Sequence, residues 1–174
     1  MGNLISTSII ALATPSGPGA LALIRLSGND VYQCIESMVR LSSGRKLTEA
    51  TSHTIHHGII IDCFDRDRVI DEVLFFVMHG PRTFTGEDTL EISCHNNELI
   101  INAIIECAII FGARLAEPGE FSRRAVLNGK MDLLAAEGIR EVLAASSQAA
   151  LKGAMASMKG SLSAYLLNFE SDLL

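Results

Sequence analysis

The first 120 residues contain short apolar runs that alternate with polar or Gly/Pro-rich segments. The runs are up to ten residues long and rich in β-branched and aromatic residues, which is typical of buried or half-buried strands. The segment "DRDR" at 65–68 lies between two of them and predicts a hairpin. Strands are therefore predicted at 8–13, 21–27, 53–61, 69–78 and 88–95.

Two segments in this part of the chain have helical periodicity. Residues 28–40 carry apolar side chains at helical spacing, after residues suited to an N-cap. Residues 96–114 are almost entirely apolar, except for a polar residue every four positions near the start. Gly112 is a predicted C-cap of this second helix. Its wide apolar face indicates burial against a sheet.

The pattern changes near residue 120, and no strand is indicated after Lys130. Segments 131–146 and 147–174 are rich in Ala and Leu and predict helices. The fold class that follows is α+β. We expect a mixed α/β domain at 1–120 and the truncated start of an all-helical domain at 121–174.

The apolar faces of these last helices have no predicted partner within the chain. We therefore expect these helices to be partly unsupported. Exposed apolar stripes of this kind drive association or mobility. The residues that form the stripes are Ile139, Val142, Leu143, Met155, Met158 and Leu162.

Composition and charge exclude several classes of function. Hydrophobic residues make up 48% of the chain, which is enough for a sizeable core. The net charge is −6 with no basic block, so direct RNA binding by this piece is not supported. No apolar run is long enough to predict a membrane span. Four cysteines without a C-x-x-C pair or a signal peptide favour a cytoplasmic protein.

Histidine and cysteine residues cluster in two segments that invite a search for a catalytic or metal site. On a strand, His53 and His57 face one side and His56 the other, so a metal-ligand set is split. We therefore expect no metal site. Cys94 and His95 are sequence neighbours, whose side chains diverge on a strand. This excludes the simplest thiol–base pair, and we expect no catalytic residue in this chain.

No segment matches the phosphate-binding loop G-x-x-x-x-G-K-[ST]. The nearest approach, "MKGS" at 158–161, places the lysine before the glycine. We therefore expect no binding of a nucleoside triphosphate by that route.

Three charged residues stand in unusual positions. Arg25 and Glu91 each interrupt an apolar strand, and Lys130 lies at the predicted domain junction. Buried or half-buried charge is costly unless it is paired. One interpretation is that these residues pair with one another structurally. The other is a pocket for a polar, flat, anionic ligand, because a carboxylate accepts two donors of one heterocycle edge and cations hold carboxylates.

Three long motifs resemble one protein family. "ALATPSGPGALALIRLSG", "GPRTFTGEDTLEISCHNN" and "RLAEPGEFSRRAVLNGKMDLLAAEGIREVLAASS" are similar, in the same order, to motifs of the MnmE (TrmE) tRNA-modification GTPases. The resemblance implies an N-terminal domain similar to the tetrahydrofolate-binding domain of aminomethyltransferases. It also implies a following helical domain, with a GTPase domain that is absent from this chain.

The resemblance implies a function as well. The N-terminal domain is expected to bind formyl-tetrahydrofolate and to form a homodimer. The whole protein is expected to act with MnmG (GidA) in aminomethyl-type modification of the wobble uridine of tRNA. GTP, Mg²⁺ and K⁺ belong to the missing GTPase domain, so we expect no GTP hydrolysis by this chain alone.

The residues that contact folate in the family correspond to Arg25, Glu91 and Lys130. The chain departs from the family pattern at several positions, including "CHNN", where Asn96 and Asn97 replace two glycines, and "GPGALA" in the first loop. Asparagine tolerates a positive φ better than most residues, should the turn need one.

Two other functions stay open at this point. The chain can be a self-sufficient one-carbon (aminomethyl) transferase, or a structural dimerisation domain whose folate pocket has decayed.

Overall fold

The computed structural model describes residues 7–158 of the chain. The chain divides into two compact units, Met1–Phe121 and Ser122–Leu174. The predicted position of Leu162 in an apolar stripe, and the predicted helix beyond residue 158, lie outside the described residues.

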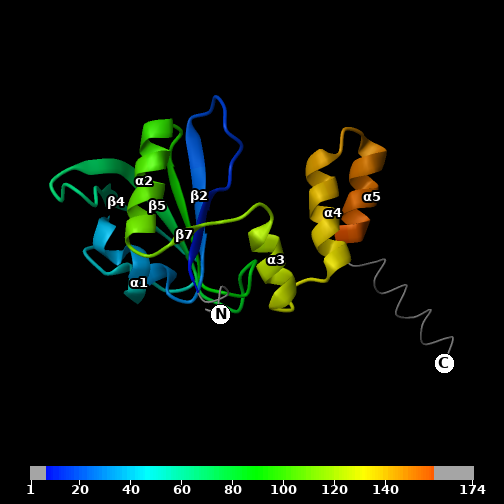
Figure 1. Cartoon of the computed structure of the whole chain (residues 1–174), viewed down its shortest axis with the longest axis horizontal. Helices are drawn as coiled ribbons and strands as arrows, with labels where there is room; N and C mark the ends of the chain where they lie inside the picture. Colours follow the sequence, from blue (N-terminus) through cyan, green and yellow to red (C-terminus); the bar gives the residue numbers. More distant parts are fainter. Residues whose placement is uncertain (1–6, 159–174) are drawn as a thin grey trace. The chain divides into compact units, whose positions relative to one another are not determined.

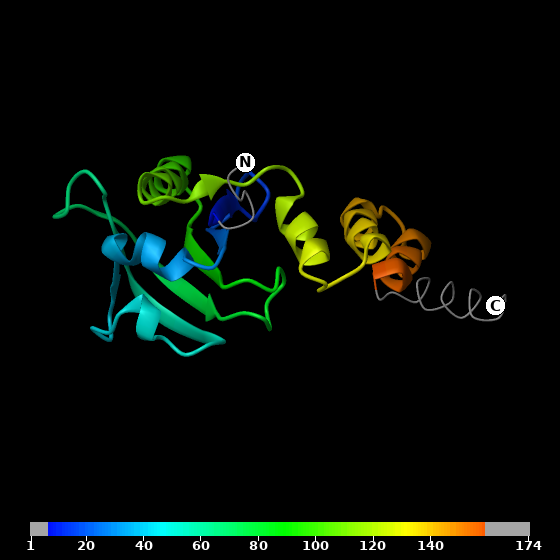
Figure 2. The same cartoon turned by 60° about the horizontal axis from the view of Figure 1, so that its bottom comes forward.

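The first unit contains a seven-stranded mixed sheet with strand order β3-β4-β5-β6-β2-β1-β7. Figures 1 and 2 show this sheet and the helices beside it. All neighbouring pairs are antiparallel except β1 and β7, which are parallel. This confirms the predicted α+β class. The strands are β1 (Ile9–Leu12), β2 (Leu21–Ser27), β3 (Val39–Leu41), β4 (Thr54–Ile61), β5 (Val69–Met78), β6 (Thr89–His95) and β7 (Arg114–Leu115).

The five predicted strands are present, and the hairpin that joins β4 to β5 is confirmed. The prediction for 28–40 was wrong in its second half. There, helix α1 (Val31–Ile35) gives way to a 3-10 turn (Glu36–Met38) and then to strand β3. Val39 and Leu41 point into the core while Arg40 is exposed, so the local pattern alternates as in a strand. A second 3-10 turn, Leu47–Glu49, lies between β3 and β4.

Helix α2 (Glu98–Ile110) packs on the sheet against β1, β5 and β6, on the face seen in Figure 1. It begins where Asn97 accepts a hydrogen bond from the Leu99 amide and ends before Gly112, whose φ is 106°. The predicted C-cap region is thus confirmed. The helix is shorter than predicted, because the chain turns at Gly112 and Arg114–Leu115 pairs with β1 instead.

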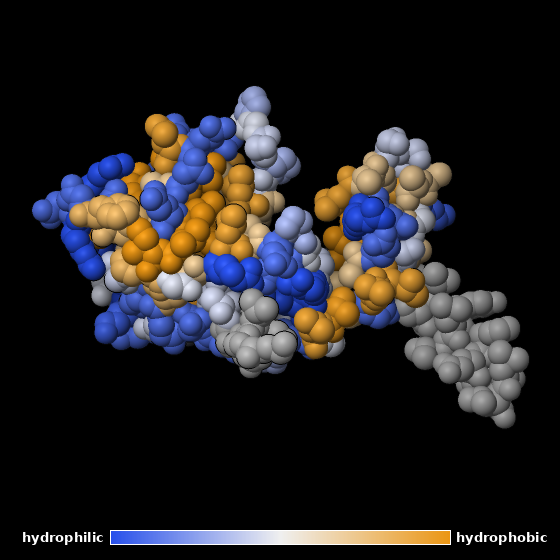
Figure 3. Space-filling model, in the orientation of Figure 1, coloured by the Kyte–Doolittle hydropathy of each residue, from blue (hydrophilic) through white to orange (hydrophobic). Residues whose placement is uncertain are grey.

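One face of the sheet carries the hydrophobic core. Alternate residues of the central strands point toward α1 and α2, and Tyr32 from α1 donates its hydroxyl to the Met78 carbonyl. Core side chains with no exposed surface include Ile10, Ile24, Leu26, Phe75 and Leu90. Figure 3 shows hydrophobic residues at the surface of this α2-bearing side as well.

The second unit is helical. Its described helices are α3 (Glu120–Leu127), which begins at the end of the first unit, α4 (Leu133–Ala144) and α5 (Gln148–Met158). Helix α4 begins at Asp132, whose carboxylate accepts a hydrogen bond from the Ala135 amide at 2.7 Å. Helix α3 was not predicted.

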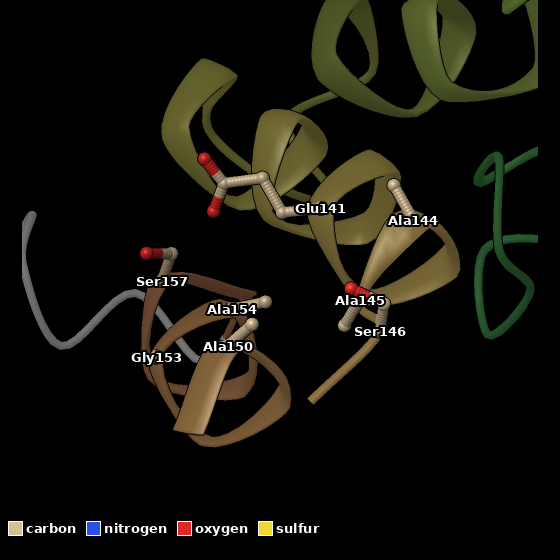
Figure 4. Close-up of a pocket in the computed structure, with 8 residues that line it drawn as sticks. All are labelled: Glu141, Ala144, Ala145, Ser146, Ala150, Gly153, Ala154 and Ser157. Carbon is tan, nitrogen blue, oxygen red and sulfur yellow. The ribbon is translucent and has the colours of Figure 1, made fainter. Parts of the chain in front are cut away.

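The helices α4 and α5 form a hairpin with small residues at their contact. Gly138 of α4 lies so close to α5 that a Cβ atom there would meet the Met158 backbone nitrogen at 2.5 Å. A shallow pocket between the two helices is shown in Figure 4. It is lined by Glu141, Ala144, Ala145, Ser146, Ala150, Gly153, Ala154 and Ser157.

No helix among residues 7–158 combines the length and the apolar character that crossing a membrane requires.

Candidate functional site

Arg25 and Glu91 lie directly opposite each other on the neighbouring strands β2 and β6. The residues on either side of them, such as Ile24 and Ile92, point into the core, so the two charged side chains share the opposite face of the sheet. Both side chains are partly exposed, at 29% for Arg25 and 17% for Glu91. The register of β2 on β6 therefore creates this pair.

The geometry of the pair leaves part of the carboxylate open. Arg25 Nε donates to Glu91 Oε1 at 2.7 Å, and Arg25 Nη2 lies 2.6 Å from the same oxygen. Within residues 7–158, no hydrogen bond to Glu91 Oε2 is observed. Arg25 and Glu91 therefore form the structural ion pair that was one of the two interpretations of these charges. It still leaves one carboxylate oxygen that can accept a hydrogen bond from a ligand.

Two aromatic rings flank the guanidinium group. The Arg25 Cζ atom lies 5.7 Å from the centre of the Phe84 ring and 5.8 Å from that of Phe121. These distances fall within the range of a cation–π contact. Phe84 comes from the "TFTGED" loop and Phe121 from the first turn of α3. Neither ring is among the site residues predicted from the sequence, although both belong to the motifs that resemble the family.

Lys130 follows α3, in the second unit. Its backbone amide donates to the Ala125 carbonyl at 2.8 Å, after a turn in which Gly129 has a φ of 66°. The structure brings Arg25 and Glu91 together. A shared site of these two residues with Lys130 stays a prediction.

Cys94 and His95 diverge, as the sequence predicts for neighbours on a strand. Cys94 is buried, and burial together with the nearby Asp71 carboxylate raises the pKa of its thiol to about 11. A thiol of this kind is protonated at neutral pH and is a poor nucleophile. His95 is exposed and its Nδ1 lies 2.8 Å from Asp71 Oδ1. The two residues form no thiol–imidazole pair.

The two asparagines of "CHNN" connect the end of β6 to its surroundings. Asn96 donates from Nδ2 to the Gly17 carbonyl at 2.7 Å, which ties the Pro/Gly loop to this turn. Asn97 has an extended backbone, with φ of −128°, and caps α2. Because neither residue is among the positive-φ positions of the described chain, the turn does not require glycine here. A pocket of about 440 Å³ lies beside this turn, lined by Leu12, Ser16, Gly17, Asn96, Glu98, Ile101 and Asn102.

The histidines 53, 56 and 57 are engaged separately. His57 lies 2.7 Å from Glu72 through Nε2, His56 contacts the Thr54 hydroxyl, and His53 contacts the Arg82 carbonyl. Among residues 7–158, the grouping of potential metal ligands is a different one: Asp62, Cys63 and Cys107. This grouping has no signature in the sequence, because 44 positions separate the two cysteines.

Comparisons with known proteins identify the same family as the three sequence motifs do. The family described as "GTP-binding protein TrmE N-terminus" matches residues 8–130. The chain belongs to this family. The match covers both strands of the Arg25–Glu91 pair and ends at Lys130, so the resemblance noted in the sequence is confirmed.

Several curated relatives carry the name tRNA modification GTPase MnmE. The proteins from Bacillus subtilis (strain 168) and Geobacillus kaustophilus (strain HTA426) are 43% and 41% identical over 167 residues, which is 96% of this chain. The relative from Levilactobacillus brevis is 42% identical over the same length. The chain spans only 36% of the Bacillus subtilis protein, so it corresponds to about a third of such a relative.

Proposed function

We propose that this chain is the folate-binding and dimerising N-terminal part of a tRNA-modification GTPase. The observation that carries the proposal is the Arg25–Glu91 pair on the open face of the sheet, within a chain that belongs to the TrmE N-terminal family. The full-length protein then acts with MnmG on the wobble uridine of tRNA. GTP, Mg²⁺ and K⁺ serve the GTPase domain of the full-length protein.

The proposed ligand is formyl-tetrahydrofolate, held through its pterin edge. Glu91 Oε1 is already occupied by Arg25, so the open oxygen Oε2 accepts the donor of the pterin. A charge-assisted hydrogen bond of this kind is about twice as strong as a neutral one. The rings of Phe84 and Phe121, about 6 Å from the guanidinium, supply apolar surface beside the pair. The family resemblance adds Lys130 as a further cation for the anionic end of the ligand.

Calorimetry with formyl-tetrahydrofolate and the Glu91→Gln variant tests the proposal. The substitution keeps the size of the side chain but removes its charge and turns an acceptor into a donor. We expect binding to weaken by roughly 2–4 kcal/mol, or about 30- to 1,000-fold. Glu72→Gln is the matched control, since Glu72 is an exposed strand carboxylate paired with His57. This control should bind as the parent does.

Three outcomes would each contradict part of the assignment. If the parent chain binds no folate, the pocket has decayed and the domain is structural. If Glu91→Gln binds as tightly as the parent, the carboxylate does not contact the ligand. If the variant does not fold, as judged by circular dichroism, the ion pair is needed for the fold itself.

The open sheet face also supports dimerisation. Leu21, Ile55 and Leu74 point to this face and are 62%, 61% and 41% exposed. Contiguous exposed apolar patches mark interaction sites, and we infer that these three residues belong to one. We expect Leu74→Asp to shift the chain from dimer to monomer in analytical ultracentrifugation. The control is Leu99→Asp on α2, which is 80% exposed but lies on the helix-covered side of the sheet, and it should leave the dimer intact.

A further inference from the structure

Three side chains that can ligate a metal ion meet between the β4–β5 hairpin and helix α2. Asp62 and Cys63 directly follow β4, and Cys107 lies in the last turns of α2. One carboxylate oxygen and the two sulfur atoms all lie within 4.8 Å of one another. Cys107 is buried, Asp62 is 7% exposed and Cys63 is half-buried. Cys107 is remote in sequence from Asp62 and Cys63, and only the packing of α2 on the sheet brings it to them.

The distances fit a tetrahedral ion with little movement. A Zn–S bond is about 2.3 Å long, so two sulfur ligands of one tetrahedral zinc lie about 3.8 Å apart. The ligand atoms already lie within 4.8 Å of one another, so they need to approach by only about 1 Å to reach this spacing. Thiolate sulfur and carboxylate oxygen are both common zinc ligands, and zinc accepts water in the remaining position.

The surroundings already support such ligands. The Cys63 amide donates to Cys107 Sγ at 3.1 Å, which is the contact that stabilises a thiolate. The Phe64 amide donates to Asp62 Oδ1 at 2.7 Å and orients the carboxylate. The Arg68 guanidinium lies 3.3 Å from Asp62 Oδ2. Its positive charge offsets the net negative charge of two thiolates, one carboxylate and a divalent ion.

We propose that Asp62, Cys63 and Cys107 bind one Zn²⁺ ion, with water as the fourth ligand, and that the ion fastens the β4–β5 hairpin to helix α2. The expectation from the sequence, that the chain has no metal site, is revised by this proposal. Two protons leave the thiols as the ion enters, and no oxidation or reduction takes place. The proposal is independent of folate binding, because it concerns the helix-covered side of the sheet.

The test is zinc binding by the full 174-residue chain under reducing conditions. We expect one zinc per chain in competition with a chromogenic chelator. Cobalt in place of zinc should give the intense near-ultraviolet absorption of cobalt–thiolate bonds. Cys63→Ser and Cys107→Ser should each weaken zinc binding by at least about 100-fold. Loss of a residue that only orients a metal ligand costs up to about 100-fold, so loss of a ligand itself should cost at least as much. Asp62→Asn should weaken it as well, while cobalt–thiolate absorption persists.

Cys34→Ser is the matched control. Cys34 is half-buried like Cys63, and its thiol donates to the Phe111 carbonyl, outside the set. This variant should bind zinc as the parent does. Because Cys107→Ser introduces a hydroxyl into the core, circular dichroism in the presence of chelator must show that each variant is folded. If Cys107→Ser does not fold, zinc binding by Cys63→Ser tests the proposal.

Either of two results overturns the proposal. One is a reduced chain that binds no zinc. This result overturns the proposal even if an added thiol oxidant joins Cys63 and Cys107 in a disulfide. The other is zinc that binds equally well to Cys63→Ser and to the parent, which places the ion elsewhere.

Discussion

The two units of this chain bury different kinds of residue. The first unit buries large side chains completely, among them Ile24, Phe75 and Leu90. In the described part of the second unit, the buried apolar residues are alanines, while Leu133 and Leu143 are 75% and 83% exposed. Burial of large apolar side chains is the main source of stability, so the first unit has the core of an independent domain. The second unit lacks one within residues 122–158.

The difference shows what helical periodicity does and does not provide. The sequence of 131–158 specifies helices, and both helices form. Helices of this length are marginal unless an apolar face is packed, because nucleation is costly and propensity is small. The hairpin of α4 and α5 packs through glycine and alanine, which bury little area. We therefore expect the second unit to unfold locally well before the first.

The largest effect should come from the core of the first unit. Phe75→Ala removes a side chain with no exposed surface. It should destabilise the unit by about 3–5 kcal/mol, the usual cost of deleting a buried aromatic ring. Leu143→Ala, at an 83% exposed position, should change stability by less than about 0.5 kcal/mol. Urea unfolding followed by circular dichroism measures both. Equal effects would show that Leu143 is buried in solution and would remove the contrast.

A smaller effect is expected at the contact of α4 with α5. In Gly138→Ala, the new Cβ would meet backbone atoms of Met158 and Ser157 at 2.5–3.0 Å. Overpacking of this kind costs about 1–3 kcal/mol and outweighs the gain in helix propensity of about 1 kcal/mol. Hydrogen exchange should therefore become faster in α4 and α5 alone.

Gly153→Ala provides the matched control for this prediction. A Cβ at Gly153 of α5 meets nothing within 4 Å, so the substitution gains helix propensity without strain. Exchange in α5 should become slower. Faster exchange in both variants would mean that the hairpin does not form as described.

The smallest effects compare one cap in each unit. Asn97 caps α2 and Asp132 caps α4. In each case a side-chain oxygen accepts a hydrogen bond from a backbone amide. Alanine at either position should cost about 1 kcal/mol. For Asn97 the loss should appear in global unfolding of the first unit. For Asp132 it should appear only as faster exchange in α4, because that helix opens locally. A global effect of Asp132→Ala would indicate that the two units unfold as one.

Sequence alone was sufficient for several features whose signal is local. Strand β2 begins and ends where the apolar run does, at residues 21 and 27, and Gly112 follows the end of α2 as predicted. Alternation of side chains also predicted that Cys94 and His95 diverge. The three motifs identified the family, because their residues were preserved in order.

Tertiary structure decided the features that depend on distant pairing. Strands β3 and β7 contain three and two residues, too few for a pattern that would identify a strand from the sequence, and they pair with the edges of β4 and β1. The sequence showed that Arg25 and Glu91 were unusual, but the register of β2 on β6 made them partners. The meeting of Cys63 with Cys107 depends on where α2 packs. Such contacts carry no local signal, because long-range packing selects them only once the sheet and its helix have formed.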